Sequence, residues 1–282
     1  MFKTYVINLK RDIENFYILE KKLNTIGINP IRFNAIYGKE IKDFSKYDKY
    51  LSKYCKYLCP RGLVGCALSH CTLLDQIHKN YLKNKDTEYT LILEDDAIPL
   101  IKDKKVIEDI IPRIPKNCDI LLLYCMGICN YNKSNKEFIK NKIPNGTGSA
   151  ASYIVKNSSI PKLLRYKIYT HIDAQWYNTI SINSYIYNRI LFNVDNTQSY
   201  NTNLKLKNLL KKFYIFKLDN ITLIELLLNK VFRIPLLNFE FTAFEIILSI
   251  IILIILYYIS KKKFIKKYLL KNIYNIIKII NG

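Results

Sequence analysis

The pattern of hydrophobic and polar positions predicts an α/β domain that starts close to the amino terminus. Residues 4–9 form a short apolar and β-branched run. Apolar residues between positions 13 and 26 then recur at helical spacing, and Gly27 follows them as a typical helix C-cap. Residues 30–34 have the composition of a second strand. A strand, a helix and a strand in this order predict a βαβ unit with parallel strands.

The same alternation continues over the first two hundred residues. Residues 40–60 lack a clear period, so we expect a loop or short helices there. Small residues at 146–152 permit close approach of the backbone to a ligand. Polar residues at 193–212 indicate a domain boundary. Helices are predicted at 62–84, 106–111, from Ser158 or Ser159 onward, and at 173–181; strands are predicted at 89–93, 119–124 and 153–155, with a strand or hairpin at 185–194.

The carboxyl-terminal region differs in composition from the rest. Residues 241–259 contain a single charge, Glu245, and as a helix they would extend about 28 Å, close to the ~30 Å of membrane hydrocarbon. We therefore predict a transmembrane helix, the alternative being a buried or interfacial helix. The predicted organisation is an α/β domain at 1–200, a linker with short helices at 201–240, the membrane helix at 241–259 and a Lys-rich amphipathic tail at 260–282.

The orientation of this segment is open. Lysines after the span favour a cytosolic tail, whereas the lack of a long apolar leader favours a cytosolic amino-terminal domain, and a single span does not satisfy both. The tail interleaves Ile, Leu and Tyr with lysines, which also suits the surface of an anionic membrane. We expect a membrane-associated protein whose catalytic domain lies in the cytosol.

Net charge and cysteines add little to this description. The formal charge of +21 favours anionic partners, but abundant Ile, Lys, Asn and Tyr are also typical of an AT-rich genome. Without a basic and aromatic recognition motif, we expect no specific nucleic-acid partner. The seven cysteines include no C-x-x-C pair, so we predict reduced thiols rather than a zinc site or a disulfide framework, which favours the cytosol.

The strongest chemical signal is the apolar run Leu91-Ile92-Leu93, which ends in three adjacent acids, Glu94, Asp95 and Asp96. An unpaired buried charge costs several kcal/mol, so these acids should lie at the carboxyl end of the strand, where α/β sheets bind ligands. A divalent metal held there would bind a phosphate. A solvated acidic turn is the simpler alternative.

Four segments together resemble glycosyltransferase family 25, which includes lipooligosaccharide and collagen hydroxylysine galactosyltransferases. Their order and spacing over the first hundred residues carry the resemblance, and fainter similarity continues to about residue 200. The four segments are Val6-Ile7-Asn8-Leu9-Lys10-Arg11, Phe33-Asn34-Ala35-Ile36-Tyr37-Gly38-Lys39, Gly62-Leu63-Val64-Gly65-Cys66-Ala67-Leu68-Ser69-His70 and Leu91 to Asp96.

The resemblance implies an α/β fold of the GT-A type, with a mixed, mainly parallel sheet and a nucleotide-sugar donor. It places the three acids at the D-x-D motif of such enzymes, where a divalent cation, expected to be Mn²⁺, neutralises the leaving diphosphate. Asp96 is the first candidate metal ligand, with Asp95 as second ligand or, like Glu94, as a donor contact. Further donor contacts are expected from Asn8 and Arg11, and from Ser69 and His70; where the family often has another Arg, this chain has Asn15.

Asp173 is the candidate catalytic base, because transfer with inversion needs a group that takes the proton of the acceptor hydroxyl and the family places an acid in this block. A helix N-cap is its structural alternative. His171 is a further candidate contact to metal or diphosphate. The expected reaction moves galactose or glucose from a UDP-sugar to a glycan or a hydroxylated protein side chain.

Other functions fit the sequence less well. A haloacid dehalogenase phosphatase needs Asp-x-Asp followed by Thr or Val, which residues 94–97 do not supply, and a receiver domain has its acidic pair after the first strand. The main alternative is a membrane-tethered interaction protein with a catalytically degenerate transferase domain. Asn15 and the extra tail favour it, whereas the intact acids at 94–96 argue against it.

Overall fold

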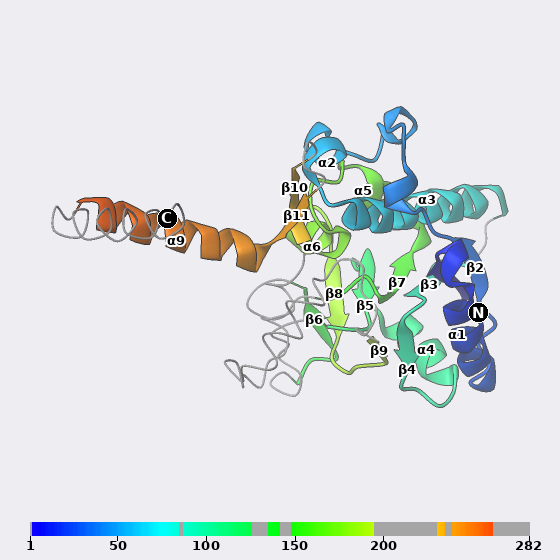
Figure 1. Ribbon diagram of the computed structural model, residues 1–282. Coiled ribbons are helices and arrows are strands. Elements are labelled where there is room, and N and C mark those ends of the chain that lie inside the picture. Colours follow the sequence, from blue (N-terminus) through cyan, green and yellow to red (C-terminus); the bar gives the residue numbers. More distant parts are fainter. Residues whose placement is uncertain are drawn as a thin grey trace.

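The structure, a computed structural model, describes residues 2–84, 87–125, 135–141, 148–194, 230–234 and 239–261. Most of the described chain forms one α/β domain around a seven-stranded sheet, and a long helix, α9, projects from it (Figure 1). The α/β class predicted from the sequence is therefore confirmed.

The predicted βαβ unit forms the amino-terminal edge of the sheet. Strands β1 (Lys3–Asn8) and β2 (Ile31–Asn34) pair in parallel and are joined by the 3-10 helix η1 (Lys10–Asp12) and helix α1 (Ile13–Thr25). Gly27 has φ 80° just after α1, and the N–H of Ile28 donates to the carbonyl of Leu23 at 2.9 Å. This left-handed glycine ends the helix and turns the chain into β2.

The sheet is mixed, in the order β2-β1-β3-β7-β5-β8-β6. Five strands run in one direction, while β7 and β6 run antiparallel to their neighbours, so the prediction of a mainly parallel mixed sheet holds. The carboxyl ends of β1 and β3 lie side by side in this arrangement. The remaining strands are β3 (Tyr89–Glu94), β5 (Ile120–Leu122), β6 (Phe138–Lys140), β7 (Ser152–Lys156) and β8 (Ser184–Tyr187).

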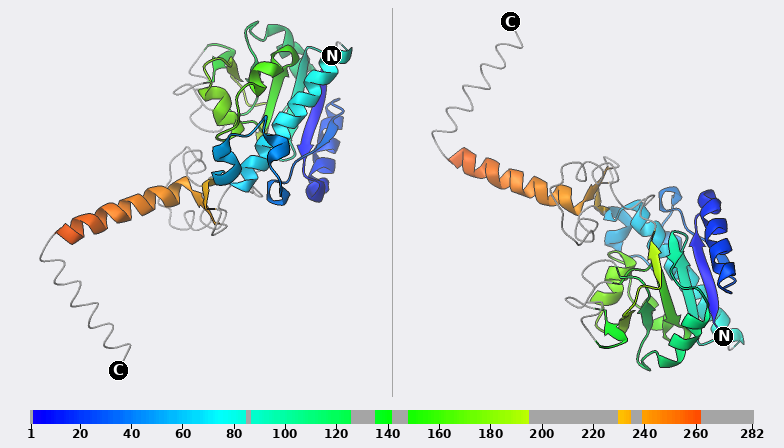
Figure 2. Two further views of the ribbon diagram at one scale, coloured as in Figure 1. Left: turned by 90° about the horizontal axis from the view of Figure 1, so that it is seen from above. Right: turned by 90° about the horizontal axis from the view of Figure 1, so that it is seen from below.

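Helices cover both faces of the sheet. Helix α3 lies with α2, α5 and α6 on one face, and α1 and α4 lie on the other (Figures 1 and 2). Their bounds are α2 (Lys53–Leu58), α3 (Arg61–Asn84), α4 (Lys105–Ile110), α5 (Ile160–Leu164) and α6 (Ile172–Asn178), with 3-10 helices η2 (Gly38–Glu40), η3 (Ser45–Tyr47), η4 (Ile111–Arg113) and η5 (Asn157–Ser159).

Strand β3 is buried on both faces. Ile92 packs into the core beneath α3, whereas Leu91 and Leu93 pack into the core beneath α1 and α4, because successive side chains of a strand point to opposite faces. All three are 0% exposed, and burying each contributes roughly 1.5–3 kcal/mol. This continuous burial explains why the strand reads as an uninterrupted apolar run that ends where the acids begin.

The loop after β2 is fixed tightly against α3. A Cβ atom on Gly38 would lie 1.8 Å from the carbonyl oxygen of Arg61, and one on Gly65 would lie 2.6 Å from the Gly38 nitrogen. The Ser69 hydroxyl accepts a hydrogen bond from the Ile36 N–H at 2.8 Å and donates to the Gly65 carbonyl at 2.7 Å. The two glycines thus allow backbone to lie against backbone, and Ser69 fastens the contact.

Two element predictions need correction. The segment predicted as one strand or hairpin at 185–194 forms β8 in the main sheet and β9 (Phe192–Val194), which pairs with β4 (Ala97–Pro99) in a separate two-stranded sheet. The edge strand β6 was not predicted, because its three residues are too few to show a period in the sequence. The helix expected at 173–181 is α6, one residue earlier at its start and shorter.

The prediction of reduced thiols is wrong for part of the cysteine set. Cys55 and Cys59 form a disulfide with a Cα–Cα distance of 4.5 Å, and Cys125 is disulfide-bonded as well, whereas three cysteines in the described part of the chain are free. A separation of four residues places two side chains on the same side of a helix, a pairing that a search for C-x-x-C overlooks. The thiols therefore no longer favour the cytosol. The free cysteines are Cys66, Cys71 and Cys118.

The carboxyl-terminal helix α9 (Ala243–Lys261) follows a hairpin of β10 (Lys230–Ile234) and β11 (Phe239–Thr242), so it starts two residues later than predicted. A capping box sets this start: the backbone N–H of Thr242 donates to the Glu245 carboxylate at 2.7 Å, and the N–H of Glu245 donates to the Thr242 hydroxyl at 3.2 Å. The one acid of the segment thus caps the helix.

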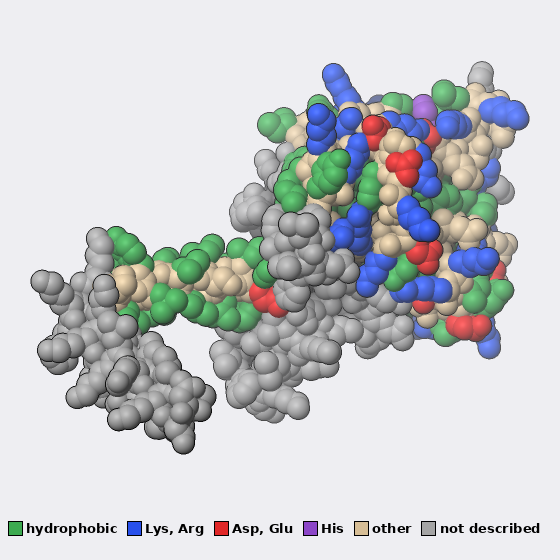
Figure 3. Space-filling view, turned by 45° about the horizontal axis from the view of Figure 1, so that its top comes forward, with side chains coloured by type: hydrophobic (Ala, Val, Ile, Leu, Met, Phe, Trp, Pro, Cys, Tyr) green, Lys and Arg blue, Asp and Glu red, His purple; other side chains and the backbone are tan. Residues whose placement is uncertain are grey.

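Helix α9 is apolar on all sides, and its large apolar side chains are exposed from Ile247 to Tyr258, where it projects from the domain (Figures 2 and 3). Within the described part of the chain it is the one helix long and apolar enough to cross a membrane, with none of its 18-residue window buried. The predicted linker at 201–240 and tail at 260–282 lie mostly outside the described residues, so the division into domains stays a prediction.

Candidate functional site

A cavity of about 180 Å³ opens at the carboxyl ends of β1 and β3. The loop after β2 and the amino-terminal half of α3 form its opposite wall, the wall that Gly38 and Gly65 hold in place. Of the predicted site residues, the cavity brings together Ser69, His70, Glu94, Asp95 and Asp96. Its other polar or aromatic lining residues are Asp12, Asn15, Tyr37, Lys39 and Cys66.

Asp95 is held from the side of β1. Its Oδ2 accepts a hydrogen bond from Asn8 Nδ2 at 2.6 Å. The same nitrogen donates to the Asp12 carbonyl at 2.8 Å, and Asn8 Oδ1 accepts from Arg32 Nε at 2.7 Å. Asn8 is 1% exposed and its amide is engaged by the protein, so in this structure it positions Asp95. Contact of Asn8 with a donor stays a prediction.

The environment of Asp95 favours its protonated form. Burial is the largest cause, opposed by the hydrogen bond from Asn8 and reinforced by the charges of Glu94 and Asp12, and together these raise the pKa of Asp95 from 3.8 to about 6. A carboxylate crowded by like charges in this way is stabilised by any cation that binds beside it.

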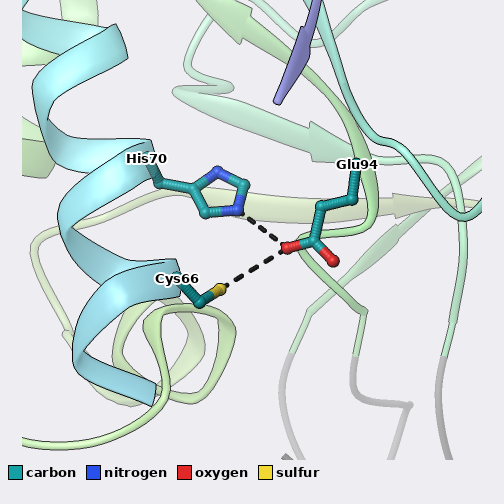
Figure 4. A group of neighbouring side chains, drawn as sticks. All are labelled: Cys66, His70 and Glu94. Atoms are coloured by element: carbon teal, nitrogen blue, oxygen red, sulfur yellow. Dashed lines mark hydrogen bonds and ion pairs between the residues drawn. The ribbon is translucent and has the colours of Figure 1, made fainter. Parts of the chain in front are cut away.

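Glu94 turns the other way, toward α3 (Figure 4). Its Oε1 lies 2.9 Å from His70 Nε2 and 3.5 Å from Cys66 Sγ. His70 Nδ1 in turn lies 2.9 Å from the Tyr153 hydroxyl, and Trp176 packs edge-on against the His70 ring at 6.1 Å. His70, 1% exposed, therefore links the core to a carboxylate at the cavity wall.

The two neighbouring acids respond oppositely to these surroundings. Burial acts to raise the pKa of Glu94, but the hydrogen bond and charge of His70, together with Cys66 and the charge of His171, bring this pKa below its ordinary value. Glu94 therefore stays ionised, whereas the pKa of Asp95 is raised.

Asp173 and His171 approach the same acids from the start of α6. His171 occupies the N-cap position, so the alternative that Asp173 caps this helix is not what the structure shows; Asp173 accepts from the N–H of Ala174 at 2.7 Å. Burial raises the pKa of Asp173, the charge of His171 lowers it and the charge of Glu94 raises it again. Among the described residues, the buried Nε2 of His171 has no hydrogen-bond partner.

Asp96 belongs to the same electrostatic neighbourhood. Burial, and then the charges of Glu94, Asp173 and Asp96, raise the pKa of the Cys66 thiol well above its ordinary value. Three carboxylates from two distant parts of the chain thus act on one thiol in the cavity wall. Asp173 does not line the cavity, but its charge acts on the same thiol as that of Asp96, which does.

Arg11 lies at the rim, beside the cavity rather than in its lining. Its guanidinium stacks over the Tyr37 ring at 4.1 Å and lies 3.5 Å from the Asp12 carboxylate. Asn15, which replaces the Arg that the family often has at this position, lines the cavity itself.

The sequence profile of glycosyltransferase family 25, described as LPS biosynthesis protein, matches residues 1–176, well over half of the chain. The chain belongs to glycosyltransferase family 25. It is a glycosyltransferase, and its mixed, mainly parallel sheet confirms the α/β class that the resemblance implies. The match covers the acids at 94–96 and reaches Asp173 in α6.

Comparison with solved structures gives weaker likenesses. A197 from STIV is 14% identical over 66% of this chain and 81% of its own, with a TM-score of 0.35. A glycosyltransferase involved in the glycosylation of the major capsid of PBCV-1 is 14% identical over 65% and 73%, with a TM-score of 0.32. Mouse xyloside xylosyltransferase 1 is 11% identical over 57% of each chain, with a TM-score of 0.32. The search of curated protein sequences finds no significant match.

Several site residues of this family 25 transferase escaped the sequence reasoning. Cys66 stands four residues before His70, so their shared helical face was visible in the sequence, but its relation to Glu94 was not. Tyr153 had no signal, because only the sheet pairing brings it to the site. Tyr37 lies in the second of the family-like segments, but its stacking with Arg11 depends on the packing of the loop.

The raised pKa of Asp95 predicts a stability effect. Because the folded-state value of about 6 exceeds the unfolded value of 3.8, ionising Asp95 opposes folding, and this penalty is absent below about pH 4 and complete above about pH 6. Asp95→Asn, whose amide oxygen still accepts from Asn8, should raise the free energy of unfolding at pH 7.5 by on the order of 1–3 kcal/mol.

Urea unfolding of metal-free wild type and variant at pH 7.5 and at pH 4.5 measures this effect. The stabilisation should shrink at the lower pH. Asp109→Asn, an exposed acid on α4, is the control and should change neither value. If Asp95→Asn is less stable than wild type at pH 7.5, the ionised carboxylate of Asp95 stabilises the fold, and the prediction is wrong.

Proposed function

We propose that this family 25 enzyme is a metal-dependent hexosyltransferase that moves galactose or glucose from a UDP-sugar to a hydroxyl of a glycan or of a hydroxylated protein side chain, with inversion. One observation carries the proposal. Glu94, Asp95 and Asp96 meet at the wall of a cavity, and the charge of Asp173, from another segment of the chain, acts on Glu94 and Cys66 of the same wall.

The residues present fit a divalent cation, for which we propose Mn²⁺. The site offers carboxylate oxygens, which suit hard cations, and the pKa of Asp95 is raised in part by neighbouring acids whose repulsion a cation relieves. His171 adds a buried ring nitrogen without a hydrogen-bond partner among the described residues. Asp96 and Asp95 would hold the ion, and His171 is a third candidate.

When bound, such an ion neutralises the charge that develops on a diphosphate leaving group. The protein supplies the positions. Asn8 orients Asp95 from the side of β1, and His70 orients Glu94 from α3, so that the cavity presents its acids in fixed directions. Fixed groups of this kind need not reorganise as charge develops, which is the main source of electrostatic stabilisation in enzymes.

Asp173 is proposed as the base that accepts the proton of the acceptor hydroxyl. Its burial and the charge of Glu94 raise its pKa, which increases its basicity, while the charge of His171 acts in the opposite direction. One carboxylate oxygen is engaged by the Ala174 N–H, which fixes the orientation of the group. The same fixed carboxylate supports attack from one face and hence inversion.

For the donor, we propose contacts from the rim formed by Arg11 and Tyr37. The Arg11 guanidinium, stacked on Tyr37, carries a positive charge beside the cavity and suits a phosphate oxygen. Asn15 in the cavity lining provides a smaller, neutral side chain than the Arg that the family often has there, so Arg11 carries the larger part of this role.

We further propose that α9 anchors the enzyme in a membrane. Its 19 residues extend about 28 Å, and none of its 18-residue apolar window is buried in the protein. A helix that is apolar on all sides and unburied in water would be a strong aggregation hazard, which a bilayer removes. As part of the same proposal, we expect the catalytic domain to face the cytosol.

Asp96 provides the first test. Full-length protein with Mn²⁺ should slowly hydrolyse a UDP-hexose from a panel of nucleotide sugars, and Asp96→Ala should lower this rate about 100-fold or more, because the leaving diphosphate loses its charge partner. Binding of UDP and Mn²⁺, measured by calorimetry, should weaken in parallel, whereas Asp109→Ala should match wild type. If no donor is hydrolysed and Asp96→Ala binds UDP and metal like wild type, the degenerate, membrane-tethered alternative is favoured.

Asp173 is tested separately from the metal. With an acceptor found by screening glycans and hydroxylated peptides, Asp173→Asn should reduce kcat for transfer by about 10² to 10⁴, since the acceptor proton loses its base. The KM for the donor should change little. Unchanged kcat would place the base elsewhere, and a rise in donor KM alone would assign Asp173 to binding.

The anchor is tested by ending the chain after Thr242, which keeps the β10–β11 hairpin and removes α9. Full-length protein should stay with membranes during carbonate extraction, while the shortened chain should be released. Donor hydrolysis by the released protein serves as the control for folding. Equal extraction of both forms would refute the anchor.

A further inference from the structure

Cys66, His70 and Glu94 form a cluster of three side chains that could bind a metal ion. Their ligand atoms, Sγ, a ring nitrogen and a carboxylate oxygen, all lie within 4.8 Å of one another at the cavity wall (Figure 4). Cys66 and His70 are one turn apart on α3 and point from the same face toward Glu94 at the end of β3. Soft sulfur beside imidazole is a donor set that zinc prefers and that manganese does not.

We propose that Cys66, His70 and Glu94 bind a thiophilic divalent cation such as Zn²⁺, at a site separate from the oxygen-ligand site of Asp95 and Asp96. Tetrahedral coordination at ordinary zinc bond lengths separates ligand atoms by roughly 3.3–3.6 Å. The Cys66 Sγ to Glu94 Oε1 distance of 3.5 Å matches this, and the His70 Nε2 to Glu94 Oε1 distance of 2.9 Å requires only a small opening.

The surroundings of His70 support its role as a ligand. A metal-binding histidine nearly always has its second ring nitrogen held by another group, which fixes the tautomer and the ring orientation. In the structure, His70 Nδ1 lies 2.9 Å from the Tyr153 hydroxyl, and Trp176 packs against the ring. With Nδ1 protonated and donating to Tyr153, Nε2 presents its lone pair to the cation.

The site has three protein ligands and borders the cavity, so the fourth position of a tetrahedral ion is open to water or to a ligand in the cavity. Binding releases the Cys66 thiol proton to solvent and leaves Cys66 as thiolate. It also takes Glu94 from its bond with His70. Occupancy by Zn²⁺ should therefore inhibit an enzyme in which His70 orients Glu94, a consequence that rests on the proposed function.

Cobalt provides a direct readout, because a thiolate bound to Co²⁺ gives a charge-transfer band in the near ultraviolet and tetrahedral Co²⁺ gives strong visible bands. Full-length protein titrated with Co²⁺ should show both, and the charge-transfer band should saturate with one ion bound at this site, whatever Co²⁺ binds at Asp95 and Asp96. Cys66→Ser should abolish the charge-transfer band, and Tyr153→Phe should weaken Co²⁺ affinity about tenfold through the lost partner of His70. Zn²⁺ should displace the bound cobalt, and excess Mn²⁺ should not.

Matched controls separate this site from other groups. Cys71→Ala removes another buried, free cysteine of the same helix, and Asp95→Asn alters the oxygen site; both should keep the charge-transfer band. Circular dichroism checks that each variant is folded. No band in wild type at saturating Co²⁺, or a band that persists in Cys66→Ser, would overturn the proposal. Because these spectra need no sugar donor, they are independent of transferase activity.

In turnover assays, Zn²⁺ should inhibit Mn²⁺-supported donor hydrolysis by wild type at concentrations at least tenfold lower than those needed for Cys66→Ser. Equal inhibition of the two proteins would show that the inhibitory ion binds elsewhere. If neither wild type nor Cys66→Ser hydrolyses a donor, the result counts against the proposed function. The cobalt spectra then decide whether the metal site exists.

Discussion

The burial of β3 on both faces is the constraint on which the site depends. Leu91, Ile92 and Leu93 have no exposed surface, so charge is excluded from the strand until its last residue. The three acids then emerge together at the sheet edge, where β1 ends beside them. Repulsion among adjacent carboxylates at a partly buried edge is costly, and the fold limits it by directing Glu94 and Asp95 to different partners.

Those partners come from opposite sides of the strand. Asn8, at the end of the neighbouring strand, holds Asp95, while His70, from the helix above, holds Glu94. Each is itself secured, Asn8 by Arg32 and His70 by Tyr153. The supports of the site are thus parts of the sheet and of the core rather than of loops. Groups held in this way keep their geometry when a ligand enters.

The sequence predicts the elements of this arrangement better than their contacts. The buried run of β3, the helix at 62–84 and the first βαβ unit were visible from periodicity, because each buries a regular face. The short strands β4, β6 and β9 were not, since three residues carry no period. The disulfide of Cys55 depends on one turn of a short helix, which composition does not reveal.

Residue types at the site were likewise predictable, whereas their partners were not. The acids at 94–96 were conspicuous because charge interrupted an apolar strand, and the family resemblance drew attention to Ser69 and His70. Ser69 contacts the loop after β2, and His70 contacts Glu94. Both contacts join residues more than twenty positions apart in the sequence, so they depend on how the elements pack. The start of α9 was shifted by a capping box that periodicity did not reveal.

The different environments of Glu94 and Asp95 shift the pKa values of these two acids in opposite directions. Adjacent in sequence, they would titrate alike in an unfolded chain, but His70 lowers the pKa of Glu94 against the effect of burial, and burial with like charges raises the pKa of Asp95 to about 6. Glu94 already has a partner that balances its charge, whereas the charge of Asp95 is only partly compensated. A cation that enters the cavity would therefore be attracted most strongly by Asp95. Two adjacent acids whose pKa values are shifted in opposite directions are typical of functional sites rather than of solvated turns.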